Sequence, residues 1–268
     1  MSDLQDQLNY YKFDSMGLMH LKTIFSAEQV NNILEKFLEN KHKYKYEQCD
    51  FIKKYVEFEQ LPGIVDLFTN SNLLDVCNNC IGQEFKLDYA VLVEQETSVD
   101  QNKTYSVHGG MHKHFNLFYY HSYPQEHITT PCYTQTGQLT VCIPLTEQNL
   151  HTGGFCYLPG SHKSSYHIHS EPFFKQYNSA DLEDCFVIPK LNQGDCIVFP
   201  ENLTHGQTLY HNTRPRYAIY AAYYPVSMQF NKDGKQRNRL FKNAARHQRK
   251  QLYPPKCHQK NLHNVPLF

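Results

Sequence analysis

The chain has 268 residues, and its 26 Lys and Arg balance its 26 Asp and Glu, so the formal net charge is zero. This balance gives no sign of a nucleic-acid partner, and we expect none. We also expect no membrane association, because no run approaches about 18 apolar residues. The polar N-terminus lacks a secretion signal, which predicts a cytoplasmic protein. An apolar share of 40% is enough for a sizeable core.

The nine cysteines are scattered along the chain, and several lie inside predicted core strands. This distribution indicates buried reduced thiols rather than a disulfide framework. Cys77 and Cys80 form a single CxxC motif on a predicted helix. Without a second pair or a βαβ context, the motif favours a structural role over zinc or redox chemistry.

Two helices are predicted in the first third of the chain. A short extended piece over residues 12–25 precedes Ser26, which forms a capping-box pattern with Gln29 three residues later. Apolar residues follow at helical spacing, which predicts an amphipathic helix. The second predicted helix covers Gly63–Cys80 and is broken near Ser71, whereas residues 41–60 carry no clear pattern.

From residue 85 onward, short runs rich in Val, Leu and Tyr are bounded by Gly, Pro, Asn or Asp, as is typical of strands. Helices followed by many short strands predict a mainly β fold, a jelly roll (double-stranded β-helix, cupin-like) with helices packed on its flanks. We expect a single domain over residues 1–268, with a helical N-terminal region (1–84), a jelly-roll core (85–227) and a basic C-terminal segment (228–268). The predicted strands are Phe85–Gln95, Gln138–Leu145, Gly154–Leu158, Asp184–Ile188, Asp195–Phe199 and Tyr217–Tyr224.

The C-terminal segment has ten Lys and Arg residues against the single acidic residue Asp233. Within it, Arg239–Leu252 is predicted to be a helix that ends before Pro254 and Pro255. The simpler interpretation is a solvated helix beside the jelly roll. The alternative is a lid over an anionic substrate.

The pattern that carries chemistry lies in residues 191–216. An apolar run follows the turn pair Gly194-Asp195, His205 comes next, and Arg216 stands eleven positions later at the start of a second apolar run. A histidine at the edge of one strand and an arginine at the start of the next can point into one cavity. Imidazole binds transition metals and guanidinium binds carboxylates, so this pattern indicates a non-haem iron enzyme.

Residues 153–163 read GGFCYLPGSHK, and G-D-x-x-x-F, L-T-H-G and the arginine eleven residues after that histidine follow. With the opening D-S-M-G-L-M-H-L-K-T-I-F-S-A-E-Q-V, these motifs resemble the phytanoyl-CoA dioxygenase family over most of the chain. The resemblance implies an Fe(II)- and 2-oxoglutarate-dependent oxygenase on a jelly-roll fold, which uses O2 to oxidise, by default to hydroxylate, a C–H bond of a small molecule. It implies that His205 is the distal metal ligand, that Arg216 binds 2-oxoglutarate, and that His162 has a structural role.

The proximal metal motif departs from the family pattern His-x-Asp. The best match is His108-Gly109-Gly110, which makes His108 the second predicted metal ligand and leaves Gly110 where the carboxylate is expected. An open coordination position beside Gly110 could hold chloride, as in iron halogenases that have a His-x-Gly or His-x-Ala motif. A halogenase is therefore the alternative function. The other possible alignments use His112-Lys113-His114 or His114-Phe115-Asn116, with a carboxylate such as Asp100 or Glu126.

A third hypothesis is a cupin-like metal-binding protein without 2-oxoglutarate chemistry. Its ligands would be His112 and His114, which share one face of a strand, with His121 or His127, and Arg216 would be structural. In every case the aromatic insert 111–136 is the predicted lid over the pocket. Its composition and the basic C-terminal segment suggest an aromatic or anionic small-molecule substrate, while the sequence is silent on oligomeric state.

Overall fold

The computed structural model describes residues 3–49, 51–56, 58, 60–82, 84–98, 107–112, 118–119, 135–164, 185–226 and 248. Of residues 3, 49, 107–112, 118–119 and 135 only the backbone is described. None of the described helices is long and apolar enough to cross a bilayer. The elements are α1 (Asp3–Met16), β1 (Met19–Leu21), α2 (Ala27–Asn40), η1 (Lys41–Lys43), β2 (Tyr46–Cys49), β3 (Ile52–Tyr55), α3 (Ile64–Phe68), α4 (Ser71–Ile81), β4 (Phe85–Gln95), β5 (Val107–His112), β6 (Phe118–Tyr119), β7 (Gln135–Thr136), β8 (Leu139–Pro144), β9 (Phe155–Tyr157), β10 (Cys196–Pro200), β11 (His205–Thr208) and β12 (Arg216–Pro225).

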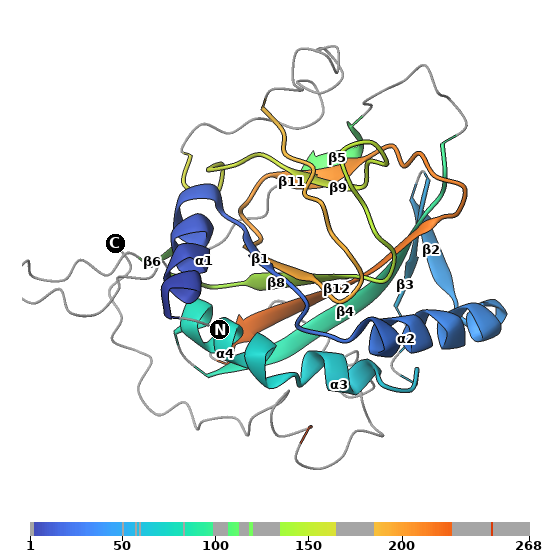
Figure 1. The fold of residues 1–268 in the computed structure, drawn as a ribbon, viewed down its shortest axis with the longest axis horizontal. Coiled ribbons are helices and arrows are strands. Elements are labelled where there is room, and N and C mark those ends of the chain that lie inside the picture. The colour runs from blue at the N-terminus through green and yellow to red at the C-terminus, as the bar shows by residue number, and fades with distance from the viewer. Residues whose placement is uncertain are drawn as a thin grey trace, which may run out of the picture.

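Two antiparallel sheets form the jelly roll (Figure 1). The large sheet has the strand order β1-β10-β8-β12-β4-β3-β2, and the small sheet has the order β5-β11-β9. Strands β6 and β7 form a separate pair. Helices α2, α3 and α4 lie along one face of the large sheet, and the small sheet lies on the opposite side (Figure 1). The predicted fold class, mainly β with flanking helices, is confirmed.

Strand β12 shows how the large sheet divides the core into two layers. Tyr217, Ile219 and Tyr223 belong to the apolar cluster on the helix side of the sheet. Ala218 belongs to a second cluster between the two sheets. Because successive strand residues point to opposite faces, the even-numbered residues of β12 line the interior of the jelly roll. Arg216, the first residue of the strand, is therefore on the interior face.

The predicted helix starts are confirmed. The Ser26 hydroxyl caps α2 by accepting a hydrogen bond from the backbone N–H of Gln29 at 3.0 Å. The predicted break in the second helix separates α3 from α4, and the side chain of Asn70 caps α4 by accepting from the Leu73 N–H at 3.2 Å. Each cap satisfies a backbone donor that the helix itself leaves unpaired.

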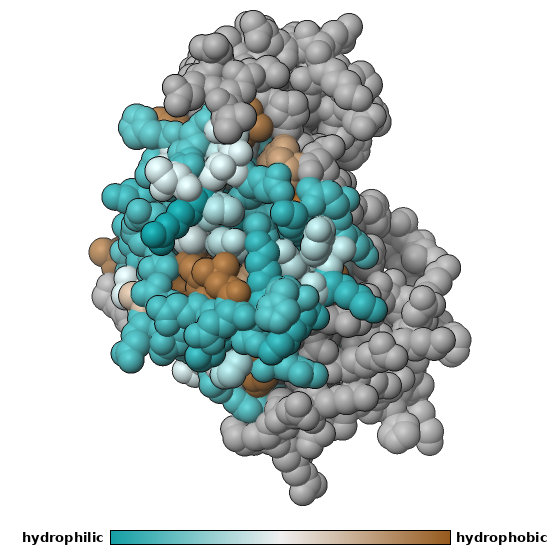
Figure 2. All heavy atoms as spheres, turned by 90° about the vertical axis from the view of Figure 1, so that its right-hand side faces the viewer, coloured by the Kyte–Doolittle hydropathy of each residue, from teal (hydrophilic) through white to brown (hydrophobic). Residues whose placement is uncertain are grey.

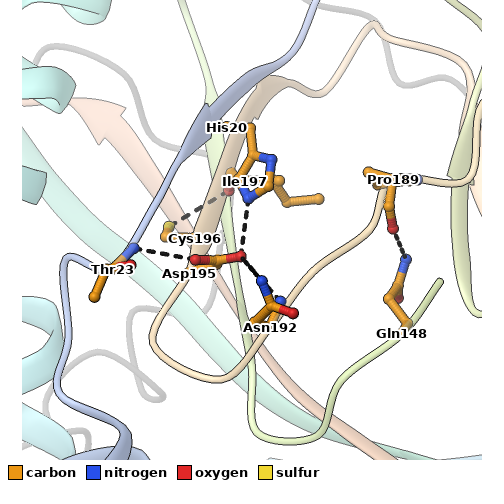
Figure 3. A network of polar contacts seen from close by, with 8 residues as sticks. All are labelled: His20, Thr23, Gln148, Pro189, Asn192, Asp195, Cys196 and Ile197. Carbon is orange, nitrogen blue, oxygen red and sulfur yellow. Dashed lines mark hydrogen bonds and ion pairs between the residues drawn. The ribbon is translucent and has the colours of Figure 1, made fainter.

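The turn pair Gly194-Asp195 ties strand β1 to the edge of the large sheet (Figure 3). The buried Asp195 carboxylate accepts hydrogen bonds from the N–H groups of Thr23, at 3.0 Å, and Asn192, at 2.9 Å. It also contacts Nε2 of His20 at 3.1 Å. Gly194 has φ +88, and a Cβ there would lie 2.4 Å from a backbone carbonyl oxygen. Only glycine fits this turn.

Three predictions of local structure need correction. The extended piece over 12–25 is extended only in β1, because α1 continues to Met16. The N-terminal region that was predicted to be helical, 1–84, also contains β1, β2 and β3, which extend the large sheet at both edges. Of the predicted strand 184–188, the described residues form a single bridge at Val187. Strand β11 was not predicted. The predicted helix 239–252 lies outside the described residues except for Gln248.

The side of the molecule that carries α2, β2 and β3 is mainly hydrophilic (Figure 2). Apolar colour appears there in limited areas, one of which lies near the centre and is surrounded by hydrophilic atoms. Scattered apolar atoms of this kind are normal for a protein surface.

Candidate functional site

His205 is the first residue of β11, the central strand of the small sheet. Its Nδ1 donates a hydrogen bond to the carbonyl oxygen of Leu203 at 2.8 Å. The ring centroid lies 4.8 Å from that of Phe199 and 6.0 Å from that of Phe155. The carbonyl contact fixes the proton on Nδ1, so that in the neutral ring Nε2 carries the lone pair. A buried, oriented imidazole of this kind is suited to bind a metal ion.

The PGSHK turn supports the loop that leads into His205. The hydroxyl of Ser161 accepts a hydrogen bond from the Thr204 N–H at 2.8 Å, and the Asn202 amide donates to the His162 carbonyl at 2.8 Å. Nε2 of His162 donates to the carbonyl oxygen of Asp14 at the end of α1, at 2.9 Å. These contacts link α1 to the residues directly before His205, in agreement with the structural role expected for His162.

Arg216 is fully buried, with 0% of its surface exposed. Its Nη1 donates to Oε1 of Gln207 at 3.3 Å, and its Nη2 donates to the hydroxyl of Tyr220 at 3.4 Å. Burial acts to lower the pKa of the guanidinium, but the nearby Tyr220 hydroxyl and Cys142 thiol outweigh it and raise that pKa above its ordinary value. The side chain is therefore a cation in the interior of the protein.

Among the described residues, no Asp or Glu lies within ion-pair distance of Arg216, and none forms a hydrogen bond with its Nε. In the same part of the chain, Oε1 of the neighbouring Gln95 is likewise buried without a hydrogen-bond partner, while its Nε2 donates to the Thr208 carbonyl at 2.5 Å. Gln95 and Arg216 are directly opposite each other on β4 and β12. Because buried charges are normally paired, this corner of the interior is suited to an anion supplied from outside the chain.

The turn at residues 153–154 leaves room for the Arg216 side chain. A Cβ at Gly154 would lie 3.0 Å from both Cδ and Nε of Arg216 and 2.7 Å from Oε1 of Gln148. Gln148 holds this turn in place, because its Nε2 donates to the carbonyls of Phe155 and Pro189 at 3.1 Å and its Oε1 accepts from the Phe155 N–H at 3.0 Å. Figure 3 shows the contact with Pro189. The glycine in the G-G-F segment of the motif therefore leaves the space that the Arg216 side chain occupies.

Strand β5 contains the predicted proximal motif, and the structure describes its backbone. His112 is directly opposite His205, whereas His108 is directly opposite Gln207. The register shifts between these two pairs, so Gly110 lies in an irregular stretch of the strand. The structure therefore brings the backbone of β5 against the strand of His205, with His112 as its direct neighbour. The alternative ligands His114, His121 and His127 lie outside the described residues.

Among the side chains that the structure describes, no three His, Cys, Asp or Glu groups form a metal-binding cluster. The CxxC cysteines, Cys77 and Cys80, are both buried on α4 and are free thiols. Burial raises the pKa of both thiols well above the ordinary value, so neither is a reactive thiolate. Their location and protonation agree with the structural role that we expected.

Some interior residues are only partly buried although they lie in the middle of sheets. Tyr220, Val91 and Tyr89 are half-buried, whereas Ala90 and Ala221 between them are buried. Tyr220 is directly opposite Val91, and both are on the interior face. Their partial exposure distinguishes this part of the interior face from the buried pair Ala218 and Val93 next to Arg216.

The sequence did not identify Gln207, Gln95, Gln148 or Tyr220 as components of the site. A signal existed for two of them. Gln207 is two residues after His205 on one strand, and Tyr220 is four residues after Arg216, so each pair shares a face. The other two contact the site through tertiary structure alone.

Comparisons with known proteins identify the family of the chain and structures of similar fold. The family model described as phytanoyl-CoA dioxygenase (PhyH) matches residues 13–218. A search of the curated proteins finds no match to the chain. HygX from Streptomyces hygroscopicus, solved with nickel, 2-oxoglutarate and hygromycin B bound, is 18% identical with a TM-score of 0.62, over 85% of this chain and 89% of its own.

Two other solved structures are similar in fold. The α-ketoglutarate-dependent epimerase SnoN from nogalamycin biosynthesis is 14% identical with a TM-score of 0.59, over 84% of this chain and 85% of its own. EctD from S. alaskensis is 20% identical with a TM-score of 0.58, over 87% of this chain and 80% of its own. The family match covers well over half of the chain and includes both His205 and Arg216. The chain therefore belongs to the phytanoyl-CoA dioxygenase family.

Proposed function

We propose that this protein is a non-haem Fe(II)- and 2-oxoglutarate-dependent oxygenase that oxidises a C–H bond of a small molecule, with hydroxylation as the expected outcome. The observation that carries the proposal is the buried cation of Arg216, which has no acidic partner among the described residues. It faces the same interior as His205. A carboxylate of 2-oxoglutarate would neutralise this charge and form a bidentate contact with the guanidinium.

The described side chains of His205 and Arg216 are suited to a metal ion and to a carboxylate, respectively. The metal would be held by Nε2 of His205 and by a histidine of β5, and the far carboxylate of 2-oxoglutarate by Arg216. When bound, Fe(II) with 2-oxoglutarate and O2 supplies the oxidising power for breaking an unactivated C–H bond. The chain's own contribution is to orient the imidazole through Leu203, to provide the buried cation, and to keep the surroundings dry with Phe155 and Phe199.

Co-substrate binding provides the first test. Anaerobic titration of the Fe(II)-loaded protein with 2-oxoglutarate should produce a metal-to-ligand charge-transfer band. Arg216→Ala should lose that band at concentrations that saturate the wild type, whereas Arg214→Ala, at an exposed position two residues earlier, should keep it. An undiminished band in Arg216→Ala would refute the assignment. Absence of the band in the wild type would instead favour the cupin-like alternative, in which the metal is bound without 2-oxoglutarate.

Strand β5 offers two candidates for the proximal metal ligand: His108, the residue predicted from the motif, and His112. The pairing of His112 with His205 supports His112, because directly opposite residues of an antiparallel pair lie on the same face of the sheet. The pairing of His108 with Gln207 supports a position nearer to Arg216. Measuring Fe(II) or Ni(II) affinity of His108→Ala and His112→Ala separates the two. The variant of the true ligand should lose at least about tenfold in affinity.

Whether the site could halogenate depends on which of these two histidines binds the metal. If His108 is the ligand, Gly110 leaves a coordination position that chloride could occupy. If His112 is the ligand, the corresponding position is His114, and the argument for chloride is lost. Mass spectrometry of the product formed in the presence of chloride or bromide distinguishes the outcomes. Gly110→Asp should abolish halogenation if the first alternative holds.

The substrate is proposed to be a small molecule that enters along the half-buried wall of Tyr220, Val91 and Tyr89. HygX was solved with hygromycin B, a small molecule, which supports this class of substrate without naming one. Tyrosine rings on the wall fit the expectation of an aromatic ligand. The basic segment 228–268, which suggested an anionic one, lies outside the described residues except for Gln248.

A further inference from the structure

Gln207 lies where the two halves of the site meet. It follows His205 by two residues on the central strand of the small sheet, with Phe155 opposite it on β9 and His108 opposite it on β5. Its side chain is half-buried, and Oε1 accepts the hydrogen bond from Nη1 of Arg216. A side chain on one sheet thus reaches across the interior to the cation on the other sheet.

The contact between Gln207 and Arg216 is weak for a buried cation. Its length of 3.3 Å, like the 3.4 Å contact between Arg216 and Tyr220, is beyond the usual range for N–H···O bonds. Both acceptors are neutral. Charge-assisted bonds from a guanidinium to a carboxylate are shorter, at about 2.7–2.9 Å, and roughly twice as strong. A carboxylate that enters this corner would therefore displace the carboxamide from Nη1.

We propose that Gln207 is a neutral place-holder for the far carboxylate of 2-oxoglutarate and helps to select a dicarboxylate; this inference rests on the proposed function. Without ligand, the carboxamide satisfies Nη1 of Arg216. With ligand, rotation of the terminal amide withdraws Oε1 from Nη1 and turns the NH2 group toward the incoming oxygens. A carboxamide can do both, because it carries an acceptor and two donors on the same group.

The place-holder residue has to be uncharged. A glutamate at this position would form a buried ion pair with Arg216, and 2-oxoglutarate would then have to break that pair. Breaking a buried charge pair is far more costly than displacing a long neutral hydrogen bond. Gln207→Glu is therefore expected to occupy the carboxylate site from within the chain. Gln207→Ala removes the acceptor without adding a charge and serves as the matched control.

The test is calorimetric titration of the metal-loaded protein with 2-oxoglutarate and with 2-oxopentanoate, which has the same number of carbons but lacks the far carboxylate. Gln207→Glu should bind 2-oxoglutarate on the order of a hundredfold more weakly and 2-oxopentanoate about as well as the wild type does. Gln207→Ala should lose no more than about tenfold for 2-oxoglutarate. A crystal structure of Gln207→Glu should have the introduced carboxylate paired with Arg216.

The outcomes separate this inference from the proposed function. Wild-type affinity of Gln207→Glu for 2-oxoglutarate would overturn the place-holder role. Equal losses for the two oxo acids would also overturn it, because they would indicate a general disturbance of the site. Absence of 2-oxoglutarate binding by the metal-loaded wild type would instead refute the proposed function itself. Metal affinity, which depends on His205 and β5, should stay at the wild-type value in both Gln207 variants.

Discussion

Gly153 offers the sharpest test of how the site is built. It has φ +75, and a Cβ there would lie 2.0 Å from the carbonyl oxygen of Leu209. Alanine in the left-handed region costs about 1–2 kcal/mol by itself. To relieve the contact, the turn at residues 152–154 has to move away from residues 208–211. That movement breaks the hydrogen bonds from the Thr208 N–H to the Gly154 carbonyl and from the His211 N–H to the Thr152 carbonyl, each 2.8 Å long.

Each of these backbone hydrogen bonds contributes about 1 kcal/mol. Gly153→Ala should therefore lower the free energy of unfolding by about 3–4 kcal/mol. The matched control is Gly63→Ala at φ +82, where the nearest atom to a new Cβ is a side-chain carbon of Ile33 at 3.6 Å. That variant should lose only the conformational term, about 1–2 kcal/mol.

Urea denaturation of the two variants, followed by circular dichroism, measures this difference. Gly153→Ala should also bind 2-oxoglutarate more weakly. Gly154 packs closely against the Arg216 side chain, so a movement of this turn should displace the guanidinium. Gly63→Ala should bind it as the wild type does. Equal destabilisation of the two variants would show that the close approach of Leu209 has no energetic consequence, and the reasoning would then be refuted.

Two further predictions concern stability. Gln148→Ala removes three hydrogen bonds, two of them buried, and leaves the Phe155 N–H without its acceptor, so it should cost about 2–4 kcal/mol in urea denaturation. A loss below about 1 kcal/mol would contradict the bracing role of this side chain. Burial raises the pKa of the Cys77 and Cys196 thiols well above the ordinary 9.0. The unfolded chain therefore releases these protons first, so that the stability they contribute is complete below about pH 9 and declines as the pH rises above it. The urea midpoint should fall above about pH 9, and it should fall less in Cys77→Ala; identical pH profiles would argue against this cause.

The elements that the sequence predicted best are those whose residue pattern follows from burial or from contacts within one turn. Strand β10 is buried on both faces, so Cys196–Phe199 appears as a continuous apolar run. The start of α2 is encoded locally, because Ser26 and Gln29 make the capping contact within one turn. In both cases the information needed lies within a few residues of the element.

Strand β11 was missed because it has no apolar pattern. Two of its four residues, His205 and Gln207, are polar although they face the interior, and Gly206 between them has no side chain. No apolar alternation remains to be recognised. Helix α1 was missed because Leu4, Leu8 and Tyr11 are exposed, so that its apolar residues do not mark its buried face. The pairing of His112 with His205 depends on an irregularity in β5 that no local pattern encodes.

The eleven residues from His205 to Arg216 connect the small sheet to the large sheet. The chain leaves the small sheet at Thr208 and enters the large sheet at Arg216, whose position is fixed by the long pairing of β12 with β4. The face on which Arg216 lies therefore depends on the register of β12 and not on the length of the connection. A glycine inserted between the exposed Thr213 and Arg214 should leave 2-oxoglutarate binding intact, since lengthening an exposed loop by one residue costs little. The same insertion between Arg216 and Tyr217 should abolish binding, because a shift of one residue turns the guanidinium to the opposite face. Loss of binding in the first variant with retention in the second would mean that loop length, and not strand register, positions the cation.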